Sequence, residues 1–390
     1  MSFISRGRAI GVLLAALVLV LLAILVGAAP YLKYTRGIYE LLTSLLVADI
    51  AIALRGKWRD AATVIGATLF GIAAIELGSA ALESGSEVNA RGFSISRAVL
   101  GWGPSAPGVY HGEKLGPGGA VIYDADYTID SDLLRHTLAA SDGPLVAFFG
   151  DSMTFGQGLP DADTLPQIYA DLSGPKSRVL NFGFPGYGPQ HFLRALETGF
   201  FDPLLTNAKI FVYLTAPWHV ERASCKAGFM ARAPRYELRD GDVSFVGACA
   251  EGLNRVFQDV FMSGAALRRF VRPVTDAPTS ADVELYLAEL RRSAELVKQK
   301  YGARLIILYM AGEEGYLTKS GFTETTIKQR LQQSGLELVD VTLSASNFPP
   351  GTLLSIPGDG HPTAVANRAR AALLQNYLAN KVSAVAEVPQ

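Results

Sequence analysis

The stretch "VAFFGDSMTFGQGL", residues 146–159, joins a run of apolar, β-forming residues to a polar turn and then to a segment typical of a short helix. Gly150 permits a sharp backbone bend, and Asp151 or Ser152 can cap the start of a helix. Taken alone, this pattern is typical of an ordinary strand-to-helix turn. A serine at such a turn can also serve as a nucleophile, so the rest of the chain has to decide between the two interpretations.

Apolar runs typical of buried strands alternate with helical patterns from residue 145 onward. The predicted strands are 145–149, 178–183, 209–216, 304–311 and 336–342, and the predicted helices are 163–172, 189–200, 281–301, 323–334 and 362–380. Near-continuous apolar strands separated by helices predict a parallel sheet covered by helices on both faces. We therefore expect an α/β domain over residues 145–390, interrupted by a loop-rich insert at 217–280.

The beginning of the chain holds most of its apolar excess, which gives a mean hydropathy of +0.23. Three uncharged or nearly uncharged runs predict three transmembrane helices within a membrane region at 1–83: 9–29, 38–54 and 61–82. The first run is longer than the apolar core of a typical signal peptide. The other two carry the acidic residues Glu40, Asp49 and Glu76, which predict contacts between helices or a path through the membrane.

Lysine and arginine predict the orientation of these spans. Arg6, Arg8, Arg55, Lys57 and Arg59 fall on one side of a three-span arrangement, and Lys33 and Arg36 fall on the other. The richer side faces the cytoplasm, which places everything after about residue 83 outside. We expect a bacterial inner-membrane protein with a periplasmic domain. One span would suffice as an anchor, so a membrane-protein partner is a further expectation.

The overall charge and motifs narrow the classes of partner. A formal net charge of −1 and the lack of a basic stripe argue against nucleic-acid binding. The sequence has no cluster of metal-ligand residues and no Gly-rich nucleotide loop ending in Lys, so we expect neither a metal nor another cofactor. Residues 84–144, rich in Gly, Pro, Ser and Asp, are predicted to form an irregular approach segment.

Cys225 and Cys249 are the two cysteines of the chain, and both lie in the insert. Between them, "PRYELRDGDVSFVG" predicts a hairpin with Asp240-Gly241 at its turn. A hairpin would bring its flanks together, which allows a disulfide in an oxidising compartment. Two free buried thiols fit the spacing equally well.

Four polar clusters follow predicted strands. They are Asp151-Ser152, "NFGFPGYG" at 181–188, "APWHVER" at 216–222 and "PGDGHP" at 357–362. In a parallel sheet of this kind, ligands bind beyond the carboxyl ends of the strands, so these clusters are expected to meet at one edge.

Acyl transfer is the chemistry that these groups would support. Ser152 needs a base to remove its proton, and His361 can be that base, with Asp359 orienting the imidazole. The oxyanion needs preorganised donors, which the backbone amides of Ser152 and Gly186 can supply. His361 or Asp359 alone would more often be a surface or turn residue, so the joint placement of the clusters carries the prediction.

These residues resemble the SGNH or GDSL hydrolases over about residues 144–380. "GDSMTFG" is similar to the first block of that family, "NFGFPG" to the second and "DGHP" to the last. The resemblance implies a three-layer, flavodoxin-like α/β domain and a cofactor-free serine esterase. It assigns the catalytic triad to Ser152, His361 and Asp359, and the oxyanion hole to Ser152 and Gly186.

Two features depart from the family pattern. The third block normally supplies an Asn that donates to the oxyanion, and no Asn follows the strand at 209–216. His219 is the best substitute donor, although it can instead bind substrate or pack in the core. Asp359 stands two rather than three residues before His361. The insert at 217–280, with Trp218, Phe229, Tyr236 and several Arg, is a candidate for one wall of a sugar-binding cleft.

The sequence is compatible with three functions. The first is a membrane-anchored periplasmic esterase that removes or transfers a small acyl group, such as acetyl, on an envelope or exported glycan. The second is a lipid esterase, since the domain is tethered to a bilayer. The third is a catalytically degenerate SGNH domain that binds glycan or acts as a scaffold.

Overall fold

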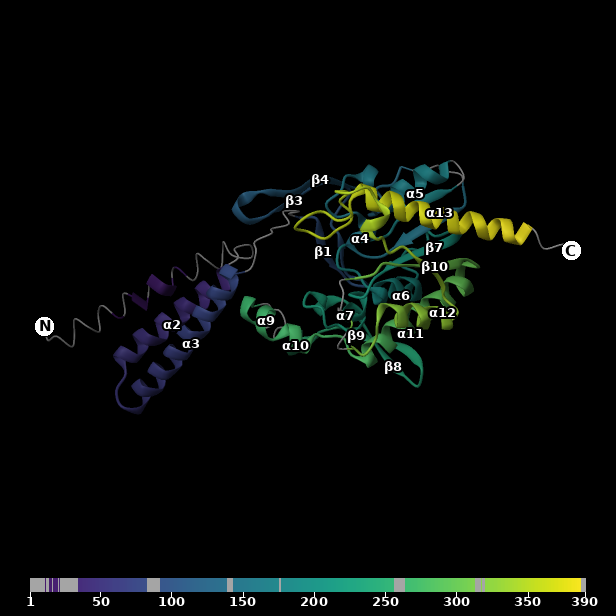
Figure 1. Ribbon diagram of the computed structural model, residues 1–390. Helices are drawn as coiled ribbons and strands as arrows, with labels where there is room; N and C mark the ends of the chain where they lie inside the picture. The colour runs from purple at the N-terminus through teal and green to yellow at the C-terminus, as the bar shows by residue number, and fades with distance from the viewer. Residues whose placement is uncertain are drawn as a thin grey trace. The chain divides into compact units, whose positions relative to one another are not determined.

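The computed structural model describes residues 34–82, 92–138, 143–174, 177–255, 264–312, 317 and 320–386, together with isolated positions between 11 and 21 (Figure 1). The chain divides into two compact units. One contains residues 1–85 and 259–275, and the other contains residues 86–258 and 276–390.

The larger unit is built on a five-stranded parallel sheet. Its strands are β5 (Leu145–Phe149), β6 (Arg178–Asn181), β7 (Ala208–Thr215), β10 (Arg304–Tyr309) and β11 (Glu337–Asp340). They lie in the order β11-β10-β7-β5-β6, and every neighbouring pair is parallel. The order changes direction between β5 and β7, which is the switch point where doubly wound sheets bind ligands. The predicted parallel α/β domain is confirmed.

Helices cover both faces of this sheet (Figure 1). On one face pack α6 (Pro189–Thr198), α7 (His219–Ala223), α11 (Ser280–Tyr301) and α12 (Glu324–Gln333), and on the other pack α5 (Leu165–Ser173) and α13 (Ala364–Ala386). Strand β5 shows why both faces must be covered. Val146 and Phe148 join the core under α5 and α13, and Ala147 and Phe149 join the core on the opposite side.

The segment before the sheet is more regular than the sequence analysis predicted. Instead of an irregular approach, residues 94–129 form two antiparallel hairpins: β1 (Ser94–Arg97) with β2 (Gly101–Pro104), and β3 (Gly108–Leu115) with β4 (Val121–Ile129). In β4 the side chains of Tyr123, Ala125, Tyr127 and Ile129 are buried, with more exposed residues between them. That alternation is the period of a half-buried strand, and the Gly- and Asp-rich composition hid it.

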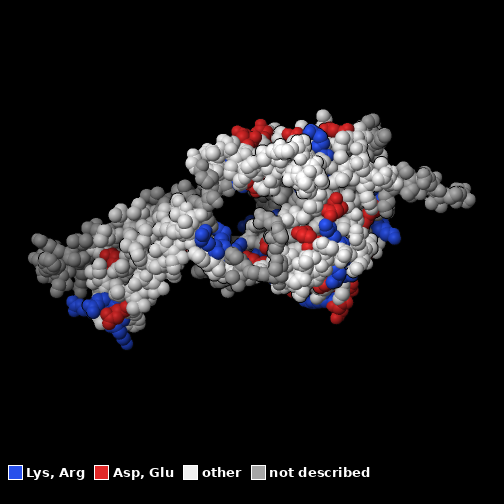
Figure 2. All heavy atoms as spheres, in the orientation of Figure 1, with Lys and Arg blue, Asp and Glu red and all other residues white. Residues whose placement is uncertain are grey.

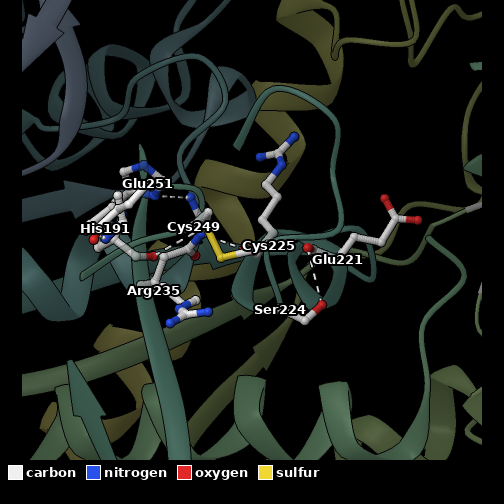
Figure 3. The surroundings of a disulfide bond; sticks show 12 residues. His191, Glu221, Ser224, Cys225, Arg235, Cys249 and Glu251 are labelled. Carbon is white, nitrogen blue, oxygen red and sulfur yellow. Dashed lines mark hydrogen bonds between the residues drawn. A yellow bond between two sulfur atoms is a disulfide. The ribbon is translucent and has the colours of Figure 1, made fainter. Parts of the chain in front are cut away.

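The predicted hairpin in the insert is present. Strands β8 (Pro234–Arg239) and β9 (Asp242–Ala248) pair across Asp240 and Gly241, whose φ angles of 52° and 90° suit a tight hairpin turn. Cys225 and Cys249 form a disulfide with their Cα atoms 5.5 Å apart (Figure 3). The bond ties the residues just after α7 to the end of β9, so the insert is closed onto the helix that carries His219.

The smaller unit contains α2 (Thr35–Ala53), α3 (Lys57–Leu82), α9 (Ala265–Phe270) and α10 (Arg272–Thr275). Within the described part of the chain, α3 is the one helix with the length and apolar composition needed to cross a bilayer, with a mean hydropathy of 1.7. Helix α2 carries three charged residues and does not meet that measure. The first predicted span, 9–29, lies mostly outside the described residues. Three spans are therefore not shown by the structure.

Glu76, one of the acidic residues in the apolar runs, connects two elements of the smaller unit. Its carboxylate oxygens accept hydrogen bonds from the backbone amides of Ala265 at 2.7 Å and Ala266 at 2.9 Å. These amides begin α9 and have no acceptor within that helix. Glu76 thus makes a contact between helices that holds the start of α9 against α3. Arg55, Lys57, Arg59 and Asp60 gather at the turn of the α2–α3 hairpin, and the visible flank of the hairpin is mostly uncharged (Figure 2).

Candidate active site

Ser152 begins the short helix α4 (Ser152–Phe155), directly after β5 at the switch point of the sheet. Asp151 caps this helix by accepting a hydrogen bond from the amide of Met153 at 2.9 Å. Gly150 has a φ of +149°, and a Cβ there would lie 2.2 Å from Oγ1 of Thr154. A glycine is therefore required for the chain to turn sharply enough to present Ser152. The amide of Ser152, in the first turn, has no acceptor within the helix.

The structure brings His361 and Asp359 to this serine. Nε2 of His361 lies 2.8 Å from Oγ of Ser152, and Nδ1 of His361 bonds Oδ2 of Asp359. Both residues lie in the loop between β11 and α13, so the three groups come from the carboxyl edge of the sheet. The amide of Ile356 donates to the His361 carbonyl at 2.7 Å, which holds the loop closed. The result is an unbroken hydrogen-bonded chain from hydroxyl to imidazole to carboxylate.

The short spacing between Asp359 and His361 does not prevent this contact. Gly360, between them, has a φ of +91°, a conformation that suits glycine and turns the chain back on itself. The backbone amide of His361 also donates to Oδ2 of Asp359, at 3.2 Å. The carboxylate therefore contacts both the backbone and the ring of the same histidine.

The Asp359 carboxylate has a second side-chain partner, a lysine ammonium that the sequence pattern did not predict. Nζ of Lys114, on β3, lies 2.5 Å from its Oδ1. Burial by itself would raise the pKa of Asp359, but the hydrogen bonds from His361 and Lys114 outweigh burial and lower it to about 2. No spacing rule could have found Lys114, because it lies 245 residues before Asp359, in a segment predicted to be irregular.

Asn181, at the end of β6, links the glycine-rich loop that follows it (residues 182–188) to α4. It is buried, its Nδ2 donates to the carbonyl of Thr154 at 3.0 Å, and its Oδ1 accepts from the amide of Gly183 at 3.0 Å. Gly186, further along the same loop, has a φ of +84°. Asn181 therefore has a positioning role, since it holds the loop that carries the Gly186 amide beside α4.

Asp151 is the centre of a buried polar network behind Ser152. Its Oδ2 accepts from Nη1 of Arg222 at 2.6 Å and from Nε1 of Trp218 at 2.9 Å. Burial would raise the pKa of Asp151, but Arg222, His219 and Trp218 together hold it well below its usual range. Asp151 is thus an ionised carboxylate with protein partners, outside the hydrogen-bonded chain of Ser152, His361 and Asp359.

The structure places both ring nitrogens of His219, the predicted substitute oxyanion donor, beside buried protein groups. Its side chain is 1% exposed, and its Nε2 lies 3.2 Å from Oδ2 of Asp151. Its Nδ1 lies 3.1 Å from both the Tyr213 hydroxyl and Oγ1 of Thr215. Burial lowers the pKa of His219, so the ring is neutral and has one N–H to donate. Both ring nitrogens therefore lie close to protein groups, Nε2 to Asp151 and Nδ1 to Tyr213 and Thr215.

Trp218 likewise uses its polar atom within the protein, since the indole N–H donates to Asp151. The aromatic side chains beside Gly186 are Trp102, from β2, and Phe229, which was among the aromatic residues expected in the wall of the cleft. A Cβ at Gly186 would lie 3.1 Å from each of these rings, which are 6.4 Å apart in an edge-to-face arrangement. The Phe229 side chain is 56% exposed. Phe229 lies in the expected insert, whereas Trp102 comes from the segment that the sequence analysis predicted to be irregular.

This arrangement can support nucleophilic acyl transfer by a serine. Ser152 has a base at hydrogen-bond distance, the base has an orienting carboxylate, and the Ser152 amide has no acceptor within α4. Among the described residues, no group of three or more His, Cys, Asp or Glu side chains is arranged to hold a metal ion.

Comparisons with known proteins give distant structural likenesses. No family model and no curated protein matches the chain. A lipolytic G-D-S-L family protein from Veillonella parvula is 14% identical, covering 60% of this chain and 96% of its own, with a TM-score of 0.34. A lipase/acylhydrolase from Enterococcus faecalis is 14% identical, covering 61% and 96%, with a TM-score of 0.35.

A carbohydrate acetylesterase family member from Sinorhizobium meliloti is also 14% identical, covering 60% of this chain and 96% of its own, with a TM-score of 0.33. Likenesses at these scores carry no argument about chemistry, which rests on the geometry of the site.

Proposed function

We propose that this chain is a serine esterase of the SGNH type, which hydrolyses or transfers a small acyl group through an acyl-enzyme. One observation carries the proposal, namely the hydrogen-bonded chain from Ser152 through His361 to Asp359. Chance would have to place three residues from two distant loops in the order and contact that nucleophilic catalysis requires.

The reaction follows from the positions of the atoms. Oγ of Ser152 attacks the ester carbonyl while Nε2 of His361 takes its proton. Asp359 stabilises the imidazolium that forms and orients the ring through Nδ1. His361 then protonates the leaving alcohol, and the acyl group stays on Ser152. Water, or a sugar hydroxyl in the transfer reaction, attacks this acyl-enzyme with His361 again acting as base.

The oxyanion of each tetrahedral intermediate needs donors that are already in place. We assign these donors to the amides of Ser152 and Gly186. The Ser152 amide is unpaired by virtue of its place in the first turn of α4, and Asn181 holds the Gly186 loop beside that helix. His219 is not part of this assignment, because its ring nitrogens face Asp151, Tyr213 and Thr215.

We propose an acylated glycan as the substrate class, with acetyl as the acyl group. Trp102 and Phe229 lie beside Gly186, and an exposed aromatic ring offers an apolar face on which a sugar ring can stack. This wall keeps Phe229 from the expected set and adds Trp102, whereas the indole N–H of Trp218 donates to Asp151.

We further propose that the chain is anchored in a bacterial inner membrane with the esterase domain in the periplasm. The apolar helix α3 and the charged turn of the α2–α3 hairpin support an anchor. The disulfide between Cys225 and Cys249 supports an oxidising compartment.

The test is hydrolysis of acetyl esters and long-chain acyl esters by the purified full chain in detergent. We expect acetyl esters, including acetylated oligosaccharides, to be cleaved. Ser152→Ala and His361→Ala should each lower kcat/KM by at least about a thousandfold, because the triad acts as a unit. His219→Gln serves as the matched histidine control and should retain most of the activity of the folded protein.

Each alternative gives a different result. A preference for long-chain esters would contradict the glycan assignment and favour a lipid esterase. Activity that survives Ser152→Ala would exclude the serine mechanism. Glycan binding without serine-dependent turnover would favour a degenerate binding domain.

A further inference from the structure

Lys114 contacts the triad from a part of the chain outside the resembling blocks. Its ammonium lies 2.5 Å from Oδ1 of Asp359, and the two side chains are 13% and 2% exposed. The other oxygen of the same carboxylate, Oδ2, bonds His361. Each oxygen of Asp359 therefore contacts a nitrogen, one from Lys114 and one from His361. The Lys114–Asp359 pair is largely shielded from water.

The hairpin that carries Lys114 also packs against the loop that follows the serine helix. The Tyr127 hydroxyl accepts a hydrogen bond from the amide of Gly158 at 2.9 Å, and Nε2 of Gln157 donates to the Tyr123 hydroxyl at 3.2 Å. Tyr123 and Tyr127 are both at most 5% exposed.

The same hairpin contacts the loop that carries Asp359 and His361. A Cβ at Gly358 would lie 3.2 Å from Cδ1 of Ile122, on β4. The hairpin is thus packed against the loops of both the nucleophile and the base, and the position of Lys114 follows from that packing.

We propose that Lys114 is a positioning residue for the triad. It keeps the Asp359 carboxylate ionised and directed at His361. Its positive charge also limits how strongly Asp359 stabilises the protonated form of His361 over the neutral form. This inference rests on the proposed serine-esterase function.

The surroundings identify Lys114 as the cation that acts on Asp359 together with His361. The titratable groups that face Asp359 from β4 are Tyr123 and Tyr127, and burial raises the pKa of both phenols, so they are neutral. Glu113, one position along β3 from Lys114, and its strand partner Asp124 point to the opposite face of the hairpin.

The consequence concerns the pH range in which the serine has a free base. With Lys114 present, the positive charge of its ammonium partly offsets the negative charge of Asp359 that acts on His361. Without it, the whole negative charge acts on His361 and favours the protonated ring. That ring cannot accept the serine proton until the pH is higher, so activity should begin at higher pH.

The experiment uses the full chain in detergent, with two readouts. The first is the rate of Ser152 labelling by a fluorophosphonate, measured between about pH 5 and about pH 9. The second is the ring NMR titration of His361, identified by its loss in His361→Ala. The variants are Lys114→Met, Lys114→Arg and the control Lys226→Met, which removes another Lys–Asp pair with a 2.5 Å contact, to Asp282.

For Lys114→Met we expect both midpoints to move to higher pH by about half a unit to one unit, with roughly 3- to 10-fold slower labelling on the acid limb. Lys114→Arg should restore most of the wild-type profile. Lys226→Met should leave both midpoints unchanged, even if it lowers the melting temperature.

Unchanged midpoints in Lys114→Met, or a loss of labelling by the same factor at every pH, would overturn the role of Lys114. The NMR titration decides this even if the wild type is not labelled. An unlabelled wild type would count against the proposed esterase, whereas a failure of the Lys114 prediction would leave serine-dependent labelling intact.

Discussion

Ser152 and Asp151 are neighbours in the sequence and have opposite surroundings. Ser152 is directed to His361, whereas Asp151 is directed inward to Arg222, Trp218 and His219. The local sequence predicted a capped helix start, and the structure contains one. A capped start and a nucleophile are therefore compatible at adjacent positions, because one residue supplies the cap and the next supplies the hydroxyl.

The Asp151 network leads to a prediction about stability. Asp151→Asn would leave the Arg222 guanidinium, whose side chain is 13% exposed, without its carboxylate. Removing one partner of a buried ion pair costs about 3 kcal/mol or more in the free energy of unfolding. Urea unfolding measures this cost. Asp340→Asn is the control, since Asp340 is 44% exposed in its pair with Lys328, and the expected cost is below about 1 kcal/mol.

The same prediction has a defined pH dependence. The pKa of Asp151 in the folded protein is lower than the unfolded value of 3.8, so its stabilising effect is complete above about pH 4 and is lost as the pH falls through the folded value. The gap between wild type and Asp151→Asn should therefore narrow below about pH 4. A gap that stays constant into that range would contradict an ionised Asp151.

At the scale of elements, the β3–β4 hairpin adds a residue to the site. The family-like blocks supply the nucleophile, the base and the oxyanion amides, and the hairpin supplies Lys114 and packs against the loops on which the nucleophile and the base lie. The hairpin thus contacts both the loop of Ser152 and the loop of His361. Neither the hairpin nor its contact with Asp359 was predicted from the sequence, because the Gly- and Asp-rich composition of residues 84–144 hid the strand period.

Gly158 lies where the hairpin and both triad loops meet, and it predicts a steric effect. It has a φ of +80°, and a Cβ there would lie 2.8 Å from Cδ1 of Ile356 and 3.1 Å from Cδ1 of Tyr123. Gly158→Ala should lower the free energy of unfolding and slow fluorophosphonate labelling at Ser152. Displacing packed side chains costs about 1–3 kcal/mol beyond the backbone strain.

The matched control for this change is Gly351→Ala. Gly351 has a φ of +85°, so the backbone strain is similar, but a Cβ there has no atom within 4 Å. Chemical unfolding and labelling of both variants separate strain from packing. Equal losses of unfolding free energy and of labelling rate in the two variants would mean that the side chains around Gly158 can move to accommodate a Cβ.

At the scale of the whole molecule, the proposed membrane orientation can be tested with reporters. A C-terminal alkaline phosphatase fusion should be active and a C-terminal green fluorescent protein fusion should be dark, because the former folds outside the cytoplasm and the latter inside it. The physical reason is the excess of Lys and Arg on the opposite side of the predicted spans. A bright fluorescent fusion with an inactive phosphatase would place the domain in the cytoplasm.

The sequence by itself determined the parallel α/β sheet, since its strands and helices carry distinct hydrophobic periods that local chemistry imposes. It also predicted that Ser152, His361, Asp359 and Gly186 lie at one edge of the sheet, because the carboxyl ends of parallel strands lie on the same side. The insert hairpin followed from Asp240-Gly241, whose turn geometry is local.

Only the tertiary structure decided the partners of these residues. The inward turn of His219 toward Asp151 depends on an ionised carboxylate that Arg222 and Trp218 also hold, and these contacts join two strand ends. The contact between Lys114 and Asp359 joins residues 245 positions apart. Sequence periodicity reports which face of an element is buried, but not what lies against that face, because long-range contacts depend on how the whole chain packs.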